Sequence, residues 1–243
     1  ITLAATANNG RIIEEPMPAG IVSPQGKKIY MITFVIGIGI PLGIIFLLNL
    51  LRFRIEGHTD VEKLTKVPII GDIPLTGSNK HEESAIAVRE NDNDIMTETF
   101  RSLRTNLLFM MGDPDKKVIL VTSTISGEGK TFIASNLALS LALLGKKVIL
   151  VGLDIRKPGL NKLFHLSHKE KGITQYLVAP KSTDLHALIQ PSGITSNLDL
   201  LLGGPIPPNP TELLARQSLE DTISTLRKEY DYIVLDTAPI GMV

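Results

Sequence analysis

VILVTSTISGEGKTF, at residues 118–132, joins four apolar residues to a short polar loop that ends in Gly129, Lys130 and Thr131. The apolar start predicts a buried strand, and the residues after the loop predict a helix. A glycine-bearing loop in this position turns backbone N–H groups toward an anion, and the helix dipole adds to the attraction. In this pattern the lysine reaches the β- and γ-phosphates of a nucleotide and the hydroxyl holds Mg²⁺. The residues expected to contact the nucleotide here are Ser126, Gly127, Glu128, Gly129, Lys130 and Thr131.

Strand and helix patterns alternate through the second half of the chain. We expect strands at 118–121, 147–153 and 232–235 and helices at 130–144 and 213–229. Continuous apolar strands separated by helices predict a parallel sheet that is covered on both faces. Ligands of such sheets bind at the carboxyl ends of the strands. Because Asp154 and Asp236 follow the second and third strands, we expect both carboxylates to lie close to Lys130.

An uncharged apolar run, IYMITFVIGIGIPLGIIFLLNLL, occupies residues 29–51. As a helix it would be about 34 Å long, enough to cross a hydrocarbon core of roughly 30 Å. The run therefore predicts a transmembrane helix rather than a buried core helix. Flanking charges do not set its direction, but ATP is cytoplasmic, so residues after Arg52 are expected in the cytoplasm. The predicted fold class is an α/β, P-loop NTPase-type parallel sheet flanked by helices and preceded by a transmembrane helix.

The rest of the chain is divided by composition. Residues 1–28 are marked by proline and too few to bury a core, so we interpret them as the end of a larger extracytoplasmic domain. Residues 52–94 predict a juxtamembrane segment and linker, and residues 95–243 predict a cytoplasmic P-loop domain. Within the juxtamembrane part we expect a short helix at 60–64, a brief strand within 67–74 and a flexible polar stretch at 76–94.

A helical pattern at 95–111 contains Glu98, Arg101 and Arg104 at spacings of three residues. This spacing places the three side chains over a restricted sector of the helix. Spacing alone favours a solvated face with one Glu–Arg pair, which contributes only about 0.2–0.5 kcal/mol.

The composition limits the function classes. The chain has 25 basic and 25 acidic side chains, and this balance argues against a general nucleic-acid-binding protein. Cysteine is absent, which excludes disulfides, a thiol nucleophile and a cysteine-ligated zinc site. Apolar residues make up 43% of 243 residues, enough for a sizeable core.

Three segments together resemble the Walker A, Walker A′ and Walker B motifs of the bacterial tyrosine kinases. They are GEGKT at 127–131, GLDIR at 152–156 and VLDTAP at 234–239. These kinases are the cytoplasmic modules of polysaccharide co-polymerases, which are related to chain-length determinant proteins. Three further segments are similar to parts of the family. DVEKLTKVPIIGDIP at 60–74 is similar to its juxtamembrane region, and ETFRSLRTN at 98–106 is similar to its Glu-x-x-Arg-x-x-Arg helix. GGPIPPNPTELL at 203–214 is similar to a segment near the site. The resemblance covers nearly the whole chain.

The resemblance implies roles for the residues at the predicted site. Lys130, Asp154 and Asp236 would be catalytic, with ATP and Mg²⁺ as cofactors. Thr131, Asp154 and Asp236 would hold the metal. Arg156 would either contact a phosphate or fix Asp154, and the sequence does not choose between these roles.

The resemblance also implies the wider function. It predicts an ATP-dependent protein-tyrosine (auto)kinase of the inner, cytoplasmic membrane that controls the chain length and export of capsular polysaccharide or exopolysaccharide. Glu98, Arg101 and Arg104 would assemble a ring-like homo-oligomer, in which a tyrosine of a neighbouring subunit is the acceptor. The polysaccharide polymerisation and export machinery would be a further partner.

Two features depart from the family pattern. The first position of Walker A′ is usually aspartate, but here it is Gly152, and loss of a general base often costs about 10²–10⁴-fold in rate. Val243 follows Walker B closely, so the later strands and the tyrosine-rich tail of the family are expected beyond it. Two alternatives therefore stay open. One is a non-catalytic, nucleotide-dependent membrane scaffold; the other is a partition-type ATPase, whose usual second lysine is replaced by Ile125.

Overall fold

The computed structural model describes residues 25–51, 55, 57–74, 86–90, 92–113, 115–166 and 171–242. The chain divides into two compact units, Ile1–Pro68 and Ile69–Val243.

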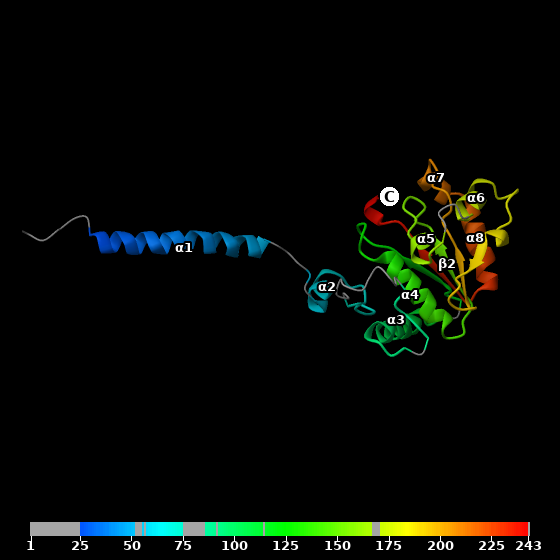
Figure 1. Cartoon of the computed structure of the whole chain (residues 1–243), viewed down its shortest axis with the longest axis horizontal. Helices are drawn as coiled ribbons and strands as arrows, with labels where there is room; N and C mark the ends of the chain where they lie inside the picture. The colour runs from blue at the N-terminus through cyan, green and yellow to red at the C-terminus, as the bar shows by residue number, and fades with distance from the viewer. Residues whose placement is uncertain are drawn as a thin grey trace, which may run out of the picture. The chain divides into compact units, whose positions relative to one another are not determined.

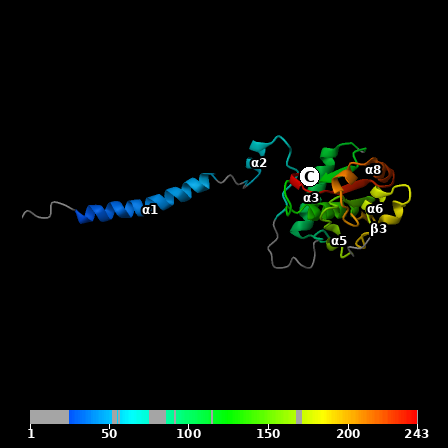
Figure 2. The ribbon, with the colours of Figure 1, turned by 90° about the horizontal axis from the view of Figure 1, so that it is seen from above.

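The described residues of the first unit form two helices. The predicted membrane helix is found as α1 (Gly26–Leu51), a continuous helix that includes Pro41 and buries none of its residues (Figure 1, Figure 2). Its length and composition are sufficient to cross a membrane. The short helix expected at 60–64 is α2 (His58–Leu64), which begins two residues earlier.

The second unit is built on a five-stranded sheet with strand order β1-β5-β2-β4-β3. The strands are β1 (Val118–Val121), β2 (Val148–Gly152), β3 (Ile189–Pro191), β4 (Leu198–Leu201) and β5 (Tyr232–Asp236). β1, β5, β2 and β4 are parallel, and only β3 is antiparallel to its neighbour β4. The parallel sheet expected from the continuous apolar strands is confirmed, and every residue of β2 is buried.

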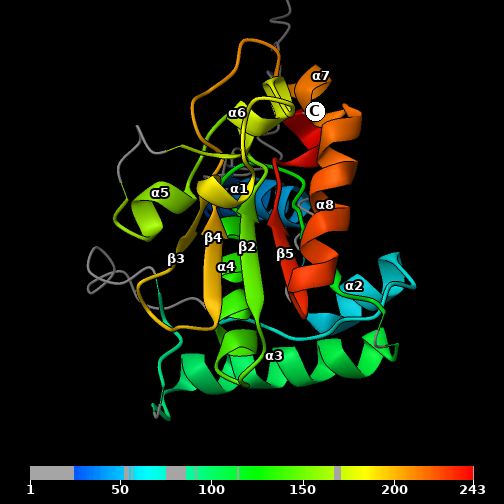
Figure 3. The ribbon, with the colours of Figure 1, turned by 90° about the vertical axis from the view of Figure 1, so that its right-hand side faces the viewer.

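Helices cover both faces of this sheet, as Figure 3 shows for α4 (Lys130–Ala142) and α8 (Gln217–Glu229). Alternate residues of a strand point to opposite faces. Accordingly, Val148 and Leu150 join the core on the α4 side, whereas Ile149 and Val151 join the core on the α8 side. Besides α3 (Ile95–Met111), the other helical segments among the described residues of this unit are α5 (Leu160–Leu163), α6 (Ile173–Val178), η1 (His186–Leu188), α7 (Pro210–Leu214) and η2 (Ile240–Met242).

α3 (Ile95–Met111) has the bounds predicted from the sequence and packs against α4. Asp94 caps its start by accepting the N–H of Thr97 at 2.7 Å, and Gly112 ends it in a left-handed conformation (φ 59°). On the side that faces α4, Phe100 is fully buried and meets the edge of Phe132 at a ring-centroid distance of 5.8 Å.

Two predicted elements are wrong in detail. The single helix expected at 213–229 is two helices, α7 and α8, because Arg216 takes an extended conformation between them (φ −76°, ψ 151°). The strand expected within 67–74 is absent from the described residues. Ile70 instead accepts a hydrogen bond from Asn106 Nδ2 at 2.9 Å, and Gly71 lies beside Leu103, so these two residues contact α3 rather than the sheet.

Part of the stretch expected to be flexible is ordered. Residues 86–90 contact the core, and Val88 is only 2% exposed. Residues 75–85 and residue 91 lie outside the described part of the chain. A polar composition predicted a linker here, but three apolar side chains, Ile86, Ala87 and Val88, pack against the core. The backbone N–H groups of Ala87 and Val88 also donate to Asn136 Oδ1.

Candidate functional site

The loop between β1 and α4 has the backbone that a phosphate cradle requires. Gly127 (φ 94°) and Gly129 (φ 84°) both lie in the left-handed region, which glycine adopts without a steric penalty. Glu128 Oε2 accepts the N–H groups of Thr124 at 2.8 Å and Ile125 at 3.2 Å. The hydrogen bond from Ile125 is the largest cause that lowers the pKa of the Glu128 carboxyl. The Glu128 side chain therefore stabilises the loop by hydrogen bonds with the loop's own backbone.

Lys130 and Thr131 form the first turn of α4, directly after this loop. Lys130 is buried, with only 8% of its surface exposed. Thr131 lies beside Gly159, where an added Cβ would be only 3.3 Å from the Thr131 hydroxyl oxygen. The loop after β2 thus approaches the hydroxyl that the sequence predicts as a metal ligand.

Main-chain hydrogen bonds join the ends of β2 and β5. The N–H groups of Leu153 and Asp154 both donate to the carbonyl oxygen of Asp236, at 2.8 and 3.0 Å. The Asp154 side chain in turn accepts the N–H of Lys157 at 3.0 Å. The expected convergence of Asp154 and Asp236 at the carboxyl edge of the sheet is therefore present.

Asp236 has the most perturbed carboxyl group at this edge. Its residue is 1% exposed, and burial raises its pKa to about 6, with the charge of Asp154 acting in the same direction. A hydrogen bond from Thr131 and the charge of Lys130 oppose this rise in pKa. Among the described residues, Asp236 Oδ1 is buried without a hydrogen-bond partner.

This set of oxygens fits a magnesium ion. Mg²⁺ prefers hard oxygen ligands, takes one or two carboxylates from the protein and completes its shell with phosphate oxygens and water. The unpartnered Asp236 Oδ1 and the neighbouring Thr131 hydroxyl supply such ligands. In the part of the chain that the structure describes, no cluster of three His, Cys, Asp or Glu residues could hold a metal ion. A magnesium ion here would therefore also need phosphate oxygens and water as ligands.

Arg156 connects the site to residues 203–214, which were expected near the site without a defined role. Its Nη2 donates to the Thr211 hydroxyl in α7 at 2.5 Å. Gly203, at the start of the same segment, has its nitrogen near β2, only 3.2 Å from where a Cβ of Gly152 would lie. The resemblance placed the segment that contains Thr211 and Gly203 near the site but gave neither residue a role, because nothing in a linear pattern pairs them with the loop after β2.

The structure leaves no free space for a side chain at Gly152. An added Cβ would be 3.0 Å from Leu160 Cδ1 and 3.2 Å from the backbone nitrogen of Gly203. Contacts below 3.4 Å require the neighbours to move. Gly152, which stands where the family's Walker A′ usually has aspartate, is therefore closely packed by its neighbours.

We expect Gly152→Asp to lower the free energy of unfolding by about 1–3 kcal/mol, the usual cost of overpacking. We also expect it not to tighten the binding of Mg²⁺–ATP. Chemical denaturation and calorimetric titration measure the two effects. Gly152→Ala is the matched control, since it adds the same Cβ without a carboxylate. A Gly152→Asp protein of unchanged stability that binds Mg²⁺–ATP more tightly would contradict this expectation.

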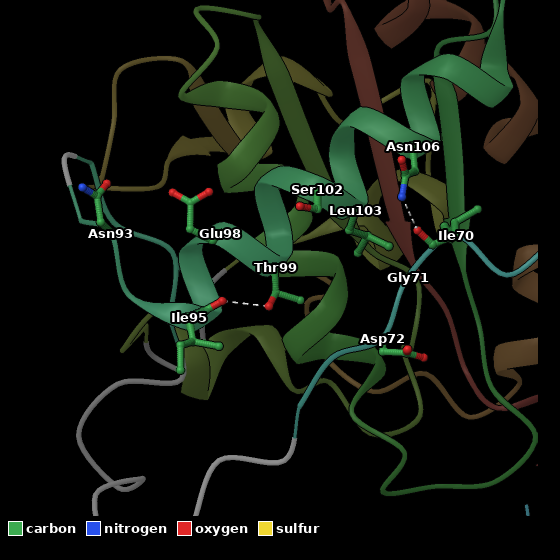
Figure 4. A pocket seen from close by; sticks show the side chains of 10 residues that line it. All are labelled: Ile70, Gly71, Asp72, Asn93, Ile95, Glu98, Thr99, Ser102, Leu103 and Asn106. Carbon is green, nitrogen blue, oxygen red and sulfur yellow. Dashed lines mark hydrogen bonds between the residues drawn. The ribbon is translucent and has the colours of Figure 1, made fainter. Parts of the chain in front are cut away.

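The three residues expected in oligomerisation lie on α3 and do not share one environment. Glu98 forms an ion pair with Arg101 and lines an open groove of about 510 Å³, together with Ser102 and Asp72 (Figure 4). Arg104 points to α4, where its Nη1 donates to the Ser140 carbonyl oxygen at 2.6 Å. The structure therefore separates Arg104 from the other two residues of the motif.

The phosphate loop, the buried lysine and the strand-end carboxylates define a P-loop nucleotide-binding protein. A family model described as an AAA domain matches residues 116–242, just over half of the chain. The chain is 36% identical to tyrosine-protein kinase YwqD of Bacillus subtilis (strain 168), over 67% of this chain and 66% of that protein. It is 28% identical to tyrosine-protein kinase wzc of Salmonella typhi, over 99% of this chain and 35% of that protein.

A solved structure agrees with these relatives. The kinase domain of Escherichia coli tyrosine kinase ETK matches with a TM-score of 0.69 and 28% identity, covering 78% of this chain and 75% of that domain. The chain belongs to the bacterial tyrosine kinase family. It spans about a third of the length of relatives such as the Salmonella typhi protein.

Proposed function

We propose that the second unit of this chain is a protein-tyrosine kinase domain that transfers the γ-phosphoryl group of ATP to tyrosine. The observation that carries the proposal is the meeting of the phosphate loop with Lys130, Thr131 and the buried Asp236 carboxylate, whose Oδ1 has no hydrogen-bond partner among the described residues. The kinase names of relatives that align with almost the entire chain support tyrosine as the acceptor. They favour a kinase over a scaffold that only binds nucleotide.

Phosphoryl transfer depends on placement and charge compensation more than on covalent chemistry by the protein. In our proposal the backbone amides of residues 126–131 surround the phosphates. Lys130 stabilises charge on the β- and γ-phosphate oxygens. Thr131, Asp236 and Asp154 hold Mg²⁺, which would neutralise charge on the phosphates when bound.

Among the described tyrosines, Tyr230 is a poor acceptor. It is 4% exposed, and its O–H donates to Asp199 Oδ2 at 2.8 Å. Lys147 Nζ lies 4.7 Å from the centre of its ring, and burial raises the pKa of its hydroxyl. We therefore propose that the acceptor is a more exposed tyrosine of a neighbouring subunit.

We further propose that α1 anchors the kinase in the inner membrane, with the P-loop domain in the cytoplasm where ATP is present. Assembly into a ring would use Glu98 and Arg101, which form an ion pair on α3, and Arg104 would support the position of that helix. The polysaccharide polymerisation and export machinery would be the partner of this assembly.

The experiment that tests the proposed function is ATP-dependent tyrosine phosphorylation by the full-length protein in membranes. We expect phosphotyrosine to accumulate with Mg²⁺–ATP and to be absent with ADP or with EDTA. Oligomers that assemble with ATP but never acquire phosphotyrosine would contradict the kinase proposal and favour a scaffold.

A further inference from the structure

One face of α4 carries three residues that all contact either α3 or the segment before it, residues 86–90. Phe132, Asn136 and Ser140 are four residues apart, so they lie one above the other on the helix surface. Phe132 meets Phe100 of α3, as described above. Asn136 and Ser140 are polar and almost completely buried, at 0% and 1% exposure. Buried polar side chains of this kind require hydrogen-bond partners.

Asn136 obtains its partners from the segment that precedes α3. Its Oδ1 accepts the N–H of Ala87 at 2.7 Å and the N–H of Val88 at 3.0 Å. Its Nδ2 donates to the Phe132 carbonyl oxygen within α4, at 2.8 Å. A single side chain thus satisfies two successive backbone donors that are 48 and 49 residues away in the sequence.

Ser140 makes the corresponding contact with α3. Arg104 Nη1 donates to the Ser140 carbonyl oxygen at 2.6 Å and lies 3.2 Å from its hydroxyl oxygen. The Ser140 hydroxyl also lies 3.4 Å from the carbonyl oxygen of Phe100, to which it donates. Residues 86–90 and α3 therefore form one layer against α4, which we call the α4 brace.

We propose that the α4 brace positions the phosphate loop, through Asn136 and Arg104, so that docking of the brace and binding of nucleotide are thermodynamically coupled. The inference rests on the proposed function. α4 is the shared element, because Lys130 and Thr131 open its first turn and Asn136 lies about 9 Å further along the same helix. A displacement of about 1 Å in a reacting group can cost roughly 10²-fold in rate, so small shifts of α4 matter.

Coupling of this kind is reciprocal: nucleotide must favour the docked brace by the same factor by which the docked brace favours nucleotide. In the sequence the brace comes before β1 and the phosphate loop and after the predicted membrane helix. A partner that pulls on or binds this part of the chain would therefore change nucleotide affinity without touching the phosphate loop. Asn136 and Arg104 are positioning residues in this account.

The test compares hydrogen exchange of the full chain with and without Mg²⁺ and the non-hydrolysable analogue AMP-PNP. We expect the analogue to slow exchange of the Ala87 and Val88 amides at least about fivefold more than exchange within α8, which lies on the other face of the sheet. Equal slowing in both places, in protein that binds the analogue, would overturn the coupling and leave the proposed function intact. Failure of the wild-type protein to bind the analogue would overturn both.

A variant gives the reciprocal measurement. Asn136→Leu removes the two acceptor contacts, and we expect it to weaken AMP-PNP binding at least about fivefold. Ser218→Ala is the matched control, because Ser218 is a buried residue whose hydroxyl bonds the Leu177 carbonyl oxygen on the opposite side of the sheet. Its affinity should stay within about twofold of wild type. Unchanged affinity in Asn136→Leu would overturn the proposal, and if that variant does not fold, the exchange experiment on wild type decides.

Discussion

Lys130→Met is expected to abolish ATP-dependent phosphotyrosine, with a loss of at least about 10²–10³-fold in rate, as when one preorganised donor is removed from an active site. Lys130 is fixed on the first turn of α4, is 8% exposed and lies close enough to Asp236 to lower the pKa of that carboxyl. Methionine has a similar length and no charge, so it removes the charge while filling most of the volume. Immunoblotting for phosphotyrosine and titration with a fluorescent ATP analogue measure the effect.

The matched control is Lys146→Met, since Lys146 is an exposed lysine outside the site. It should phosphorylate tyrosine and bind nucleotide like the wild type. Phosphotyrosine that persists in the Lys130→Met protein, in the absence of any other kinase, would contradict the role given to Lys130.

Asp236→Asn is expected to have two opposite effects. It removes the buried carboxylate proposed to hold Mg²⁺, so metal-dependent nucleotide binding should be lost. It also removes a group whose ionisation is unfavourable in the folded protein without ligands, because burial and the charge of Asp154 raise its pKa from 3.8 to about 6. One pKa unit corresponds to about 1.4 kcal/mol, so we expect the nucleotide-free variant to be more stable than wild type by about 1–3 kcal/mol at pH 7.5.

The sign of the pH dependence follows from proton binding. Between pH 4 and 6 the folded protein keeps the Asp236 proton that the unfolded chain has already lost, so in wild type this group's contribution to stability falls as the pH rises. The advantage of Asp236→Asn should therefore shrink toward pH 4. Protons should also compete with Mg²⁺, and we expect the affinity of wild type for Mg²⁺–nucleotide to fall below about pH 6.

Denaturant unfolding at pH 7.5 and pH 4.5, without nucleotide, checks the stability effect. Asp221→Asn is the control, since it makes the same chemical change at an exposed carboxylate on α8. An Asp236→Asn protein that is less stable than wild type at pH 7.5, or that binds Mg²⁺–nucleotide normally, would contradict our assignment.

The parts of the fold that follow from local pattern were predictable. Four apolar residues before a glycine-bearing loop identified β1 and the start of α4, and β2 and β5 were equally clear. β3 and β4 were missed. β3 has three residues and ends in Pro191, and Asp199 interrupts the apolar run of β4, so only pairing within the sheet makes either segment a strand.

The site was predictable to the extent that topology determines it. Parallel strands end at one edge of the sheet, which is why Asp154 and Asp236 could be expected to meet near Lys130. The contacts that orient these groups were not predictable. Arg156 reaches Thr211 and Asn136 reaches Ala87 across 55 and 49 residues of sequence, and such pairs depend on how loops and layers pack. For the same reason, it was not predictable that Arg104 contacts α4 while Glu98 and Arg101 pair with each other.

The most direct test of the central claim is a crystal structure of this domain with Mg²⁺ and AMP-PNP. We predict a metal ion about 2.0–2.1 Å from the Thr131 hydroxyl oxygen, the ligand distance that Mg²⁺ demands, with Asp236 coordinating it directly or through one water. Lys130 Nζ should contact the β- and γ-phosphates. A nucleotide bound away from residues 126–131, or a metal ion remote from Asp236, would contradict the account.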